Sequence, residues 1–302
     1  MTLNRIGSVA LLNNTLNHVT QVQERLGTLQ TQISSGLKAE TFEGLNGQVE
    51  FYTQLNSKLR LTNQLKDGNT TGIGRLQTAD QSLSGLEETA NSLINLITSS
   101  INSGAAPSLN LKQQVQGLLN QFSDQLNVTY DGRYIFGGTN TTQPPVASIS
   151  ASNATLGIPD DVYYGGSKDN VVYRANEQVT YAFPVRADDS AFQKIYAAAN
   201  LAVSAFGSND TAGLETARKL AQDGNTELIG ARTRLNTTLV NTRTINTQLD
   251  AQSKYLEGLV GEVSNTDIVA ATTQASNYEA ILQATYQVYA RLSQLKLSDY
   301  LK

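Results

Sequence analysis

The sequence has no cysteine and no tryptophan, and only five prolines and one histidine among its 302 residues. Without cysteine, a disulfide-stapled fold, cysteine-ligated zinc and thiol nucleophiles are excluded. No apolar run reaches the ~20 residues that a membrane span needs, so we predict no membrane insertion. The single histidine, His18, has Asn14 and Val22 one helical turn away. Neither is the carboxylate or hydroxyl partner that a catalytic or metal-binding imidazole needs, so we predict a packed or surface residue.

Positive charge is also scarce. The chain has 22 Lys and Arg against 26 Asp and Glu, for a net charge of −4. This balance argues against nucleic acid as a partner, because phosphate binding needs a basic surface. Residues 1–20 contain one Arg, no compact apolar region and no small-residue cleavage site. We therefore expect no cleaved secretory signal.

Residue patterns typical of enzyme sites are not visible. The pairs Asp160-Asp161 and Asp188-Asp189 lack the loop spacing that supplies six to eight oxygens to Ca²⁺, and roles in loops and helix caps are favoured. Gly137-Gly138 lacks the Lys and Ser or Thr of a phosphate-binding loop. No set of nucleophile, base and acid is apparent. We predict no catalytic residues, no cofactor, no metal and no small-molecule substrate, so that an enzyme is the weakest hypothesis.

Proline divides the chain. All five prolines lie between Pro107 and Pro184, which leaves a proline-free arm at each end. In both arms apolar residues recur three or four positions apart, as in a coiled-coil seam. Ser34-Ser35-Gly36 is typical of a helix C-terminus, and Asp267 of a helix N-terminus. The predicted assembly interface in these arms comprises Val9, Leu12, Leu16, Val19, Leu26, Ile33, Ile268, Tyr278, Leu282, Tyr289, Leu292 and Leu295.

The middle of the chain has a different pattern. Asp131-Gly132 indicates a turn, and residues 133–136, 162–166, 170–174 and 178–183 alternate like short strands. The motif that opens this segment consists of Gly132, Arg133, Tyr134, Ile135, Phe136, Gly137 and Gly138. Six of the thirteen tyrosines lie between Tyr130 and Tyr181. They are ordinary strand residues, although a sugar- or protein-binding face stays open as an alternative.

The predicted fold class is mainly α with a β-rich insertion. Long antiparallel coiled-coil helices are formed by the N- and C-terminal arms, beside a small outer β domain. We predict three parts: residues 1–40 with 264–302 as a terminal coiled-coil assembly domain, 41–130 with 188–263 as a helical rod, and 131–187 as the outer domain. The apolar stripes of the two arms carry so little charge that few ion pairs would fix the alignment of one helix along another. Small shifts of these helices along one another are therefore permitted.

Four stretches resemble the bacterial flagellin family, and because they lie in both arms and in the insertion, the resemblance covers the whole chain. They are residues 26–38, residues 131–141, Tyr163–Gly166 with the strands that follow to residue 183, and residues 280–301. One departure follows Lys38. Where the family usually has an Asp-Asp-Pro-like turn, this chain has Glu40-Thr41-Phe42-Glu43-Gly44, so the bend is expected to differ.

The resemblance implies a structural subunit of the bacterial flagellum that joins hook-side proteins to the filament. It implies that the terminal helices form an inner coiled-coil tube, the middle helices an outer wall, and the insertion a solvent-facing part. The implied partners are other copies of the chain, flagellin, hook-associated proteins and a flagellar export chaperone. The implied location is extracellular, after export through the flagellar type III apparatus.

Two questions stay open from the residues alone. The apolar stripes of the arms fit an intramolecular core or an intermolecular one, and we favour the intermolecular interpretation because two isolated helices would leave much apolar surface wet. We therefore expect the arms to become ordered on assembly.

A filament-forming flagellin is the alternative function. A coiled-coil adhesin or binding module that displays the tyrosine-rich insertion is a more remote one.

Overall fold

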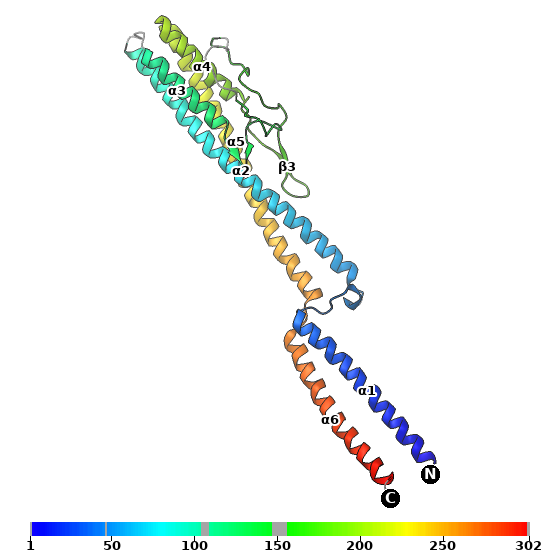
Figure 1. Cartoon of the computed structure of the whole chain (residues 1–302). Helices are drawn as coiled ribbons and strands as arrows, with labels where there is room; N and C mark the ends of the chain where they lie inside the picture. The colour runs from blue at the N-terminus through cyan, green and yellow to red at the C-terminus, as the bar shows by residue number, and fades with distance from the viewer. Residues whose placement is uncertain (1, 46, 104–108, 147–155, 301–302) are drawn as a thin grey trace. The chain divides into compact units, whose positions relative to one another are not determined.

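The computed structural model describes residues 2–45, 47–103, 109–146 and 156–300, and it describes no side chains for residues 2–12, 43, 109 and 292–300. The described chain is mainly helical with two small antiparallel ribbons, which confirms the predicted fold class (Figure 1). It divides into two compact units, Met1–Arg60 with Ser253–Lys302, and Leu61–Gln252. The predicted three-part division remains a prediction.

The elements follow one another in a simple order. The α-helices are α1 (Thr2–Ser35), α2 (Val49–Asn102), α3 (Leu109–Leu126), α4 (Ser190–Ser208), α5 (Thr211–Ser264) and α6 (Ile268–Tyr300), with a short 3-10 helix η1 (Phe42–Leu45). The strands are β1 (Thr129–Tyr130), β2 (Arg133–Tyr134), β3 (Val172–Arg174) and β4 (Thr180–Ala182). β1 pairs with β2 and β3 with β4, both antiparallel.

In the first unit, α1 and α6 lie side by side and run antiparallel (Figure 1). α1 ends at Ser35 because Gly36 takes a left-handed conformation (φ 73°). Asp267 caps α6, since its Oδ1 accepts a hydrogen bond of 3.0 Å from the Ala270 amide. Both predicted helix ends are therefore confirmed. The two connections meet in a short bridge, in which the Lys38 amide donates to the Ser264 carbonyl (2.7 Å) and the Thr266 amide to that of Gly36 (2.9 Å).

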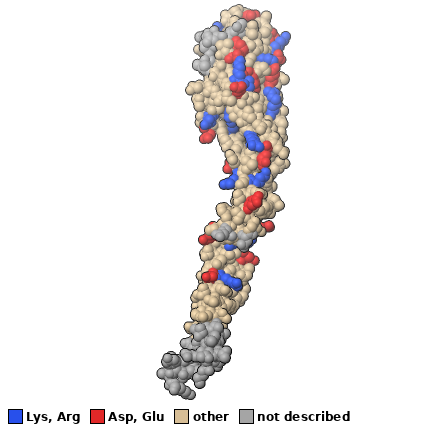
Figure 2. Space-filling view, turned by 90° about the vertical axis from the view of Figure 1, so that its right-hand side faces the viewer, with Lys and Arg blue, Asp and Glu red and all other residues tan. Residues whose placement is uncertain are grey.

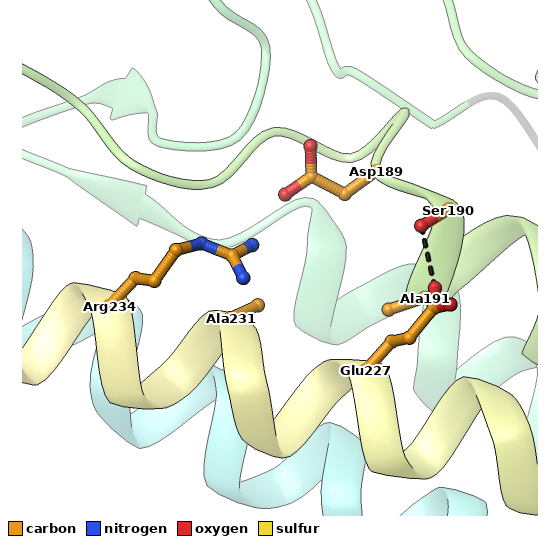
Figure 3. A pocket seen from close by; sticks show the side chains of 6 residues that line it. All are labelled: Asp189, Ser190, Ala191, Glu227, Ala231 and Arg234. Carbon is orange, nitrogen blue, oxygen red and sulfur yellow. Dashed lines mark hydrogen bonds between the residues drawn. The ribbon is translucent and has the colours of Figure 1, made fainter.

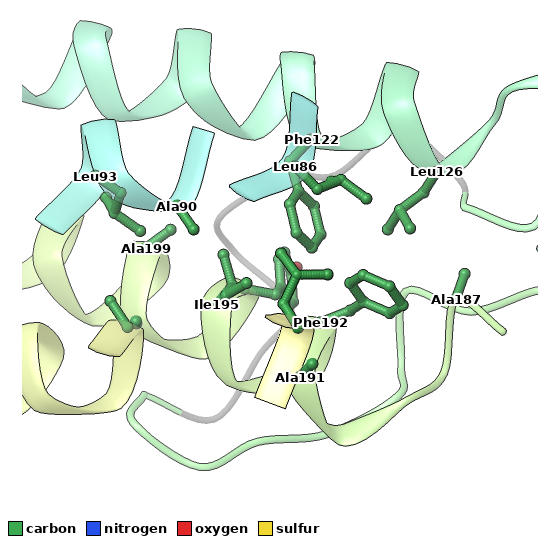
Figure 4. Close-up of a cluster of buried hydrophobic side chains, with 14 of the residues drawn as sticks. Leu86, Ala90, Leu93, Phe122, Leu126, Ala187, Ala191, Phe192, Ile195 and Ala199 are labelled. Atoms are coloured by element: carbon green, nitrogen blue, oxygen red, sulfur yellow. The ribbon is translucent and has the colours of Figure 1, made fainter. Parts of the chain in front are cut away.

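The second unit has a continuous core built by four helices. The buried residues of α2 fall three or four apart and are 0–2% exposed: Leu76, Ala79, Leu83, Leu86, Ala90, Leu93 and Ile97. Phe122 of α3 and Phe192 of α4 meet edge to face at 6.1 Å (Figure 4). Arg232 joins α5 to α2 through Asp80 (2.8 Å) and Glu87 (3.1 Å). Burial of this many large side chains is enough to hold the bundle together without another chain.

The insertion shares the core of the helices. Phe136, Phe183 and Tyr163 lie in the same cluster of buried residues as α2 to α5. The strand predicted at residues 162–166 is reduced to a single antiparallel bridge between Tyr164 and Val146. A turn precedes the bridge, since the Tyr164 amide donates to the Asp161 carbonyl (2.9 Å). The Tyr163 side chain is buried, and its hydroxyl donates to the Ala187 carbonyl (2.8 Å). The glycines of α2 permit close contacts with this segment, since a Cβ at Gly74 would overlap the Tyr130 ring.

Candidate assembly interface

The two terminal helices share a narrow apolar seam. Leu29 of α1 packs with Ala271 and Ala275 of α6, and these three side chains are 4–8% exposed. Leu26, Ile33 and Tyr278 pack against this cluster from its sides, partly buried. The spacing of three and four residues along both helices places these positions on facing stripes, which is why the pair forms.

Two polar contacts cross the pair. Gln23 Nε2 donates to the Tyr286 hydroxyl over 2.8 Å, and an Arg25 guanidinium nitrogen donates to the Tyr278 hydroxyl over 3.2 Å. Charged side chains are sparse over the described part of α1 and α6, whereas they are frequent over the second unit (Figure 2). The terminal pair is therefore held by a few apolar side chains and by tyrosine hydroxyls.

Several large apolar side chains of this pair remain in solvent. On α6, Ile281 is 42% exposed and Val288 53% exposed, both outside the seam. The other exposed apolar side chains of the pair are Leu16, Ile268, Val269 and Tyr286. A groove of about 380 Å³ lies between the helices and is lined by Asn14, Thr15, His18, Ala284, Thr285 and Val288. A stable monomer rarely leaves such a surface uncovered, so this surface is suited to contact another chain.

The structure brings part of the predicted interface together. Leu26, Ile33 and Tyr278 pack on the seam cluster, Leu282 is 8% exposed, and Val19 and Tyr289 are half-buried. Leu16 and Ile268 are exposed instead. The side chains of Val9, Leu12, Leu292 and Leu295 lie outside the described residues. The apolar stripes of the two arms also pass through Val22, Leu29, Ala271 and Ala275, although the predicted interface set leaves them out. All four are buried, so the spacing placed them on the seam correctly.

The motif that opens the insertion forms a hairpin and a core contact. Asp131 and Gly132 both have positive φ (52° and 70°), as a two-residue hairpin turn between β1 and β2 requires. Ile135 and Phe136 are buried, while Arg133 is exposed. Gly138 also has positive φ (62°). Arg75 of α2 donates to the Ile135 carbonyl (2.9 Å) and lies 4.8 Å from the centre of the Phe183 ring. The sequence patterns did not single out Arg75.

A polar pocket lies where α4 begins beside α5. It is lined by Asp189, Ser190, Ala191, Glu227, Ala231 and Arg234 (Figure 3). Asp189 occupies the N-cap position of α4, as predicted, but its carboxylate makes no capping hydrogen bond. Burial, followed by the charge of Asp188, raises the pKa of Asp189 to about 6. Hydrogen bonds from Lys194 and Ser190 hold the pKa of Glu227 below its usual value. The Ser190 hydroxyl donates to Glu227 Oε2 over 2.6 Å (Figure 3), and Lys194 Nζ donates to Glu227 Oε1 over 2.5 Å, so two donors hold this carboxylate in place.

The described residues form neither a membrane-spanning helix nor a cluster of metal ligands. In residues 2–45, 47–103, 109–146 and 156–300, no helix is both long enough and apolar enough to cross a membrane. In the same part of the chain, no group of three or more histidines and carboxylates is placed to hold a metal ion. His18 is exposed at the edge of the groove between α1 and α6.

A bundle with a complete core, joined to a helix pair with an uncovered apolar surface, is typical of subunits that neighbouring chains complete. Residues 6–141 match the family model described as the bacterial flagellin N-terminal helical region. This part of the chain is therefore similar to the helical region of flagellins, and the predicted resemblance to the flagellin family is confirmed.

Solved structures share the fold. FlgL from Bacillus cereus is 16% identical, with a TM-score of 0.55 over 70% of this chain and 99% of that one. A protein from Vibrio parahaemolyticus, assigned as flagellar hook-associated, is 15% identical, with a TM-score of 0.57 over 71% of this chain and 96% of that one. No curated protein sequence matches the chain. At these identities the likeness to the two structures concerns the fold.

Proposed function

We propose that this protein is a structural subunit of the bacterial flagellum, which joins hook-side proteins to the filament through its paired terminal helices. The flagellin region over residues 6–141 supports this role. So does the fold shared with FlgL and with a protein assigned as hook-associated. The role is mechanical: the chain supplies surfaces that bind other subunits, and it catalyses no reaction.

One observation carries the proposal, namely the contrast between the two units. In the second unit the large side chains that form the core are almost fully buried, as Phe122 and Phe192 are at 0–1% exposure. On the terminal pair, Ile281 and Val288 remain about half exposed next to a seam that is only a few residues wide. Full burial of a side chain of this size stabilises by about 1.5–3 kcal/mol, so covering the exposed half of each one adds about 1 kcal/mol. Assembly therefore supplies burial that the single chain lacks.

We infer the geometry of the contact from this surface. A groove between α1 and α6 is lined in part by the exposed Val288. A protruding apolar residue on one copy that enters a groove on the next makes a heterologous contact, which extends into a ring or helical array rather than closing as a two-fold dimer. A junction subunit would form one short layer of such an array.

The remaining parts of the proposal concern place and partners. The flagellum is the location, and the partners are further copies, hook-associated proteins and flagellin. Residues 1–40 and 264–302 would make these contacts, 41–130 with 188–263 would form the rod, and 131–187 would face solvent. Export through the flagellar apparatus, with a dedicated chaperone, completes the scheme. A pull-down of the full chain from its own cells, followed by mass spectrometry, tests the chaperone.

The decisive experiment changes the exposed row without touching the seam. Ile281→Asp with Val288→Asp should leave urea unfolding of the full chain unchanged, because both side chains already face water. It should abolish incorporation between purified hooks and filament, since a charge would be buried there without a partner. Val172→Asp is the matched control, because Val172 is 60% exposed on β3. Normal incorporation of the double variant would refute the proposal.

A filament-forming flagellin is a second candidate, because the matching family model describes a flagellin region. The two functions predict different behaviour of the purified chain. A flagellin should polymerise alone into long filaments, whereas a junction subunit should add one short layer to a hook or filament end. Electron microscopy with and without flagellin seeds separates them.

A further inference from the structure

The seam between α1 and α6 does not specify its own register by hydrophobicity. Along α6 the seam positions recur every seven residues, so a slip of one heptad would replace Ala275 with Leu282 opposite Leu29. Apolar residues would still face apolar residues after such a slip. Glu279 is the only charged residue between Ile268 and Ala290, so ion pairs do not fix the alignment either.

Close to the connections the alignment is set by the backbone bridge, in which the Lys38 amide donates to the Ser264 carbonyl and the Thr266 amide to the Gly36 carbonyl. The two tyrosine contacts are placed to hold the same alignment further along the pair. Gln23 and Arg25 are two positions apart in α1, which puts them about 200° apart around the helix, on opposite flanks of the seam. Gln23 donates to Tyr286, and Arg25 donates to Tyr278. A slip of one heptad moves each hydroxyl by about 10 Å along the helix axis, well beyond hydrogen-bonding distance.

No tyrosine replaces either partner after a slip. The residues seven positions from Tyr278 are Ala271 and Thr285, and those from Tyr286 are Glu279 and Ser293. We propose that the hydroxyls of Tyr278 and Tyr286 hold the register of α6 against α1 beyond the backbone bridge, and thereby fix where the exposed row of α6 meets the next subunit. This inference rests on the proposed function for its biological consequence, but not for the contacts themselves.

The absence of native cysteine makes a direct test practical. Leu29→Cys with Ala275→Cys reports the observed register, because these positions pack together. Leu29→Cys with Leu282→Cys reports a slip of one heptad. Each pair is introduced into the full-length chain, both in the parent sequence and with Tyr278→Phe and Tyr286→Phe. After oxidation, linked peptides from the monomer band are quantified by mass spectrometry.

In the parent chain the observed-register link should dominate. Removing both hydroxyls should raise the ratio of slipped to observed links by about fivefold, which converts to about 1 kcal/mol at 1.4 kcal/mol per factor of ten. Tyr255→Phe is the control, since Tyr255 lies on α5 and is 67% exposed; it should leave the ratio unchanged. A general loss of stability would lower the yields of both disulfides together. Loss of register would instead raise the yield of the slipped-register disulfide and lower that of the observed-register disulfide.

An unchanged ratio in the double phenylalanine variant would overturn the inference, and so would equal linking of both pairs in the parent chain. Incorporation into hook–filament assemblies is scored separately, without engineered cysteines. If the parent chain does not incorporate, the proposed function is refuted, but the ratio of slipped to observed disulfides still tests the register of α6 against α1. If the double phenylalanine variant slips and yet incorporates normally, register does not determine assembly.

Discussion

At the scale of single residues, Arg75 has the clearest structural task. Its guanidinium is half-buried, and burial lowers its pKa from the usual value. It donates to the Ile135 carbonyl and lies over the Phe183 ring, so it ties α2 to both ends of the insertion. Hydrogen bonds from charged groups and cation–π contacts in desolvated sites are each worth about 1–3 kcal/mol.

Arg75→Met should therefore destabilise the second unit by about 2–3 kcal/mol, because the Ile135 carbonyl loses its charged donor. Urea unfolding followed by circular dichroism measures the change. Lys219→Met removes a cation from an exposed position of α5 and should cost less than about 0.5 kcal/mol. Equal effects of the two variants would show that Arg75 does no more than a surface charge.

The adjacent carboxylates Asp188 and Asp189 should respond in opposite ways to the same change. Asp188 accepts two hydrogen bonds from Arg186, at 2.8 and 3.1 Å. Asp189 is desolvated, and its pKa is raised from 3.8 to about 6. Between these values the folded state binds more protons than the unfolded chain, so the Asp189 contribution to stability falls as pH rises and reaches its minimum above about pH 6.

Asp189→Asn should thus raise the free energy of unfolding by about 1–2 kcal/mol near neutral pH, and the gain should vanish in acid. Asp188→Asn should lower it by about 1–3 kcal/mol, because the half-buried Arg186 loses its charged partner, although it keeps a hydrogen bond to Asn170. Unfolding curves of both variants at several pH values provide the measurement. A gain from Asp189→Asn that did not depend on pH would rule out this explanation.

At the scale of elements, the turn glycines distinguish backbone strain from steric exclusion. Gly132 and Gly138 have similar positive φ angles, 70° and 62°. A Cβ at Gly132 would meet nothing within 4 Å, whereas one at Gly138 would overlap the carbonyl oxygens of Ser167 and Asp169. The hairpin tip is therefore open, while the second turn is packed against the rest of the insertion.

Gly132→Ala should cost about 1 kcal/mol, the price of a left-handed conformation for an L-residue. Gly138→Ala should cost more than about 3 kcal/mol, because backbone atoms must also move. Thermal unfolding of the two variants gives the comparison. If both substitutions cost the same, the contacts of Gly138 would be less confining than the structure shows.

At the scale of the whole molecule, the division into two units predicts separable behaviour. The core of Leu61–Gln252 contains no residue of α6. Deletion of residues 281–302 should therefore preserve the main unfolding transition and abolish incorporation into flagellar structures. Calorimetry and electron microscopy of the same preparation measure the two properties. Collapse of the main transition would show that α6 supports the bundle, against this account.

The expected ordering of the arms on assembly is also a property of the whole molecule. The seam contains few buried side chains, so its free energy does not greatly exceed the entropy of ordering both helices. Hydrogen exchange on the dilute full chain should show weak protection in α1 and α6, strong protection in the second unit, and slower exchange of the arms after assembly. Strong protection of the arms in the isolated chain would contradict the prediction.

Much of the architecture followed from local chemistry. Periodic apolar residues predicted the long helices, Gly36 and Asp267 predicted where two of them end and begin, and the absence of proline from the arms left them free to be helical. These features depend on neighbouring residues in the chain, so a single sequence is enough to reveal them. The flagellin resemblance likewise followed from contiguous stretches.

Contacts between distant residues were decided only by the tertiary structure. Examples are the hydrogen bonds from Gln23 to Tyr286 and from Arg25 to Tyr278, the contact of the half-buried Arg75 with the insertion, and the turn at residues 162–166. Spacing alone also did not separate seam positions such as Leu282 from exposed ones such as Ile281. Helical periodicity tells which residues share a stripe, but only the position of the partner helix decides which stripe is covered.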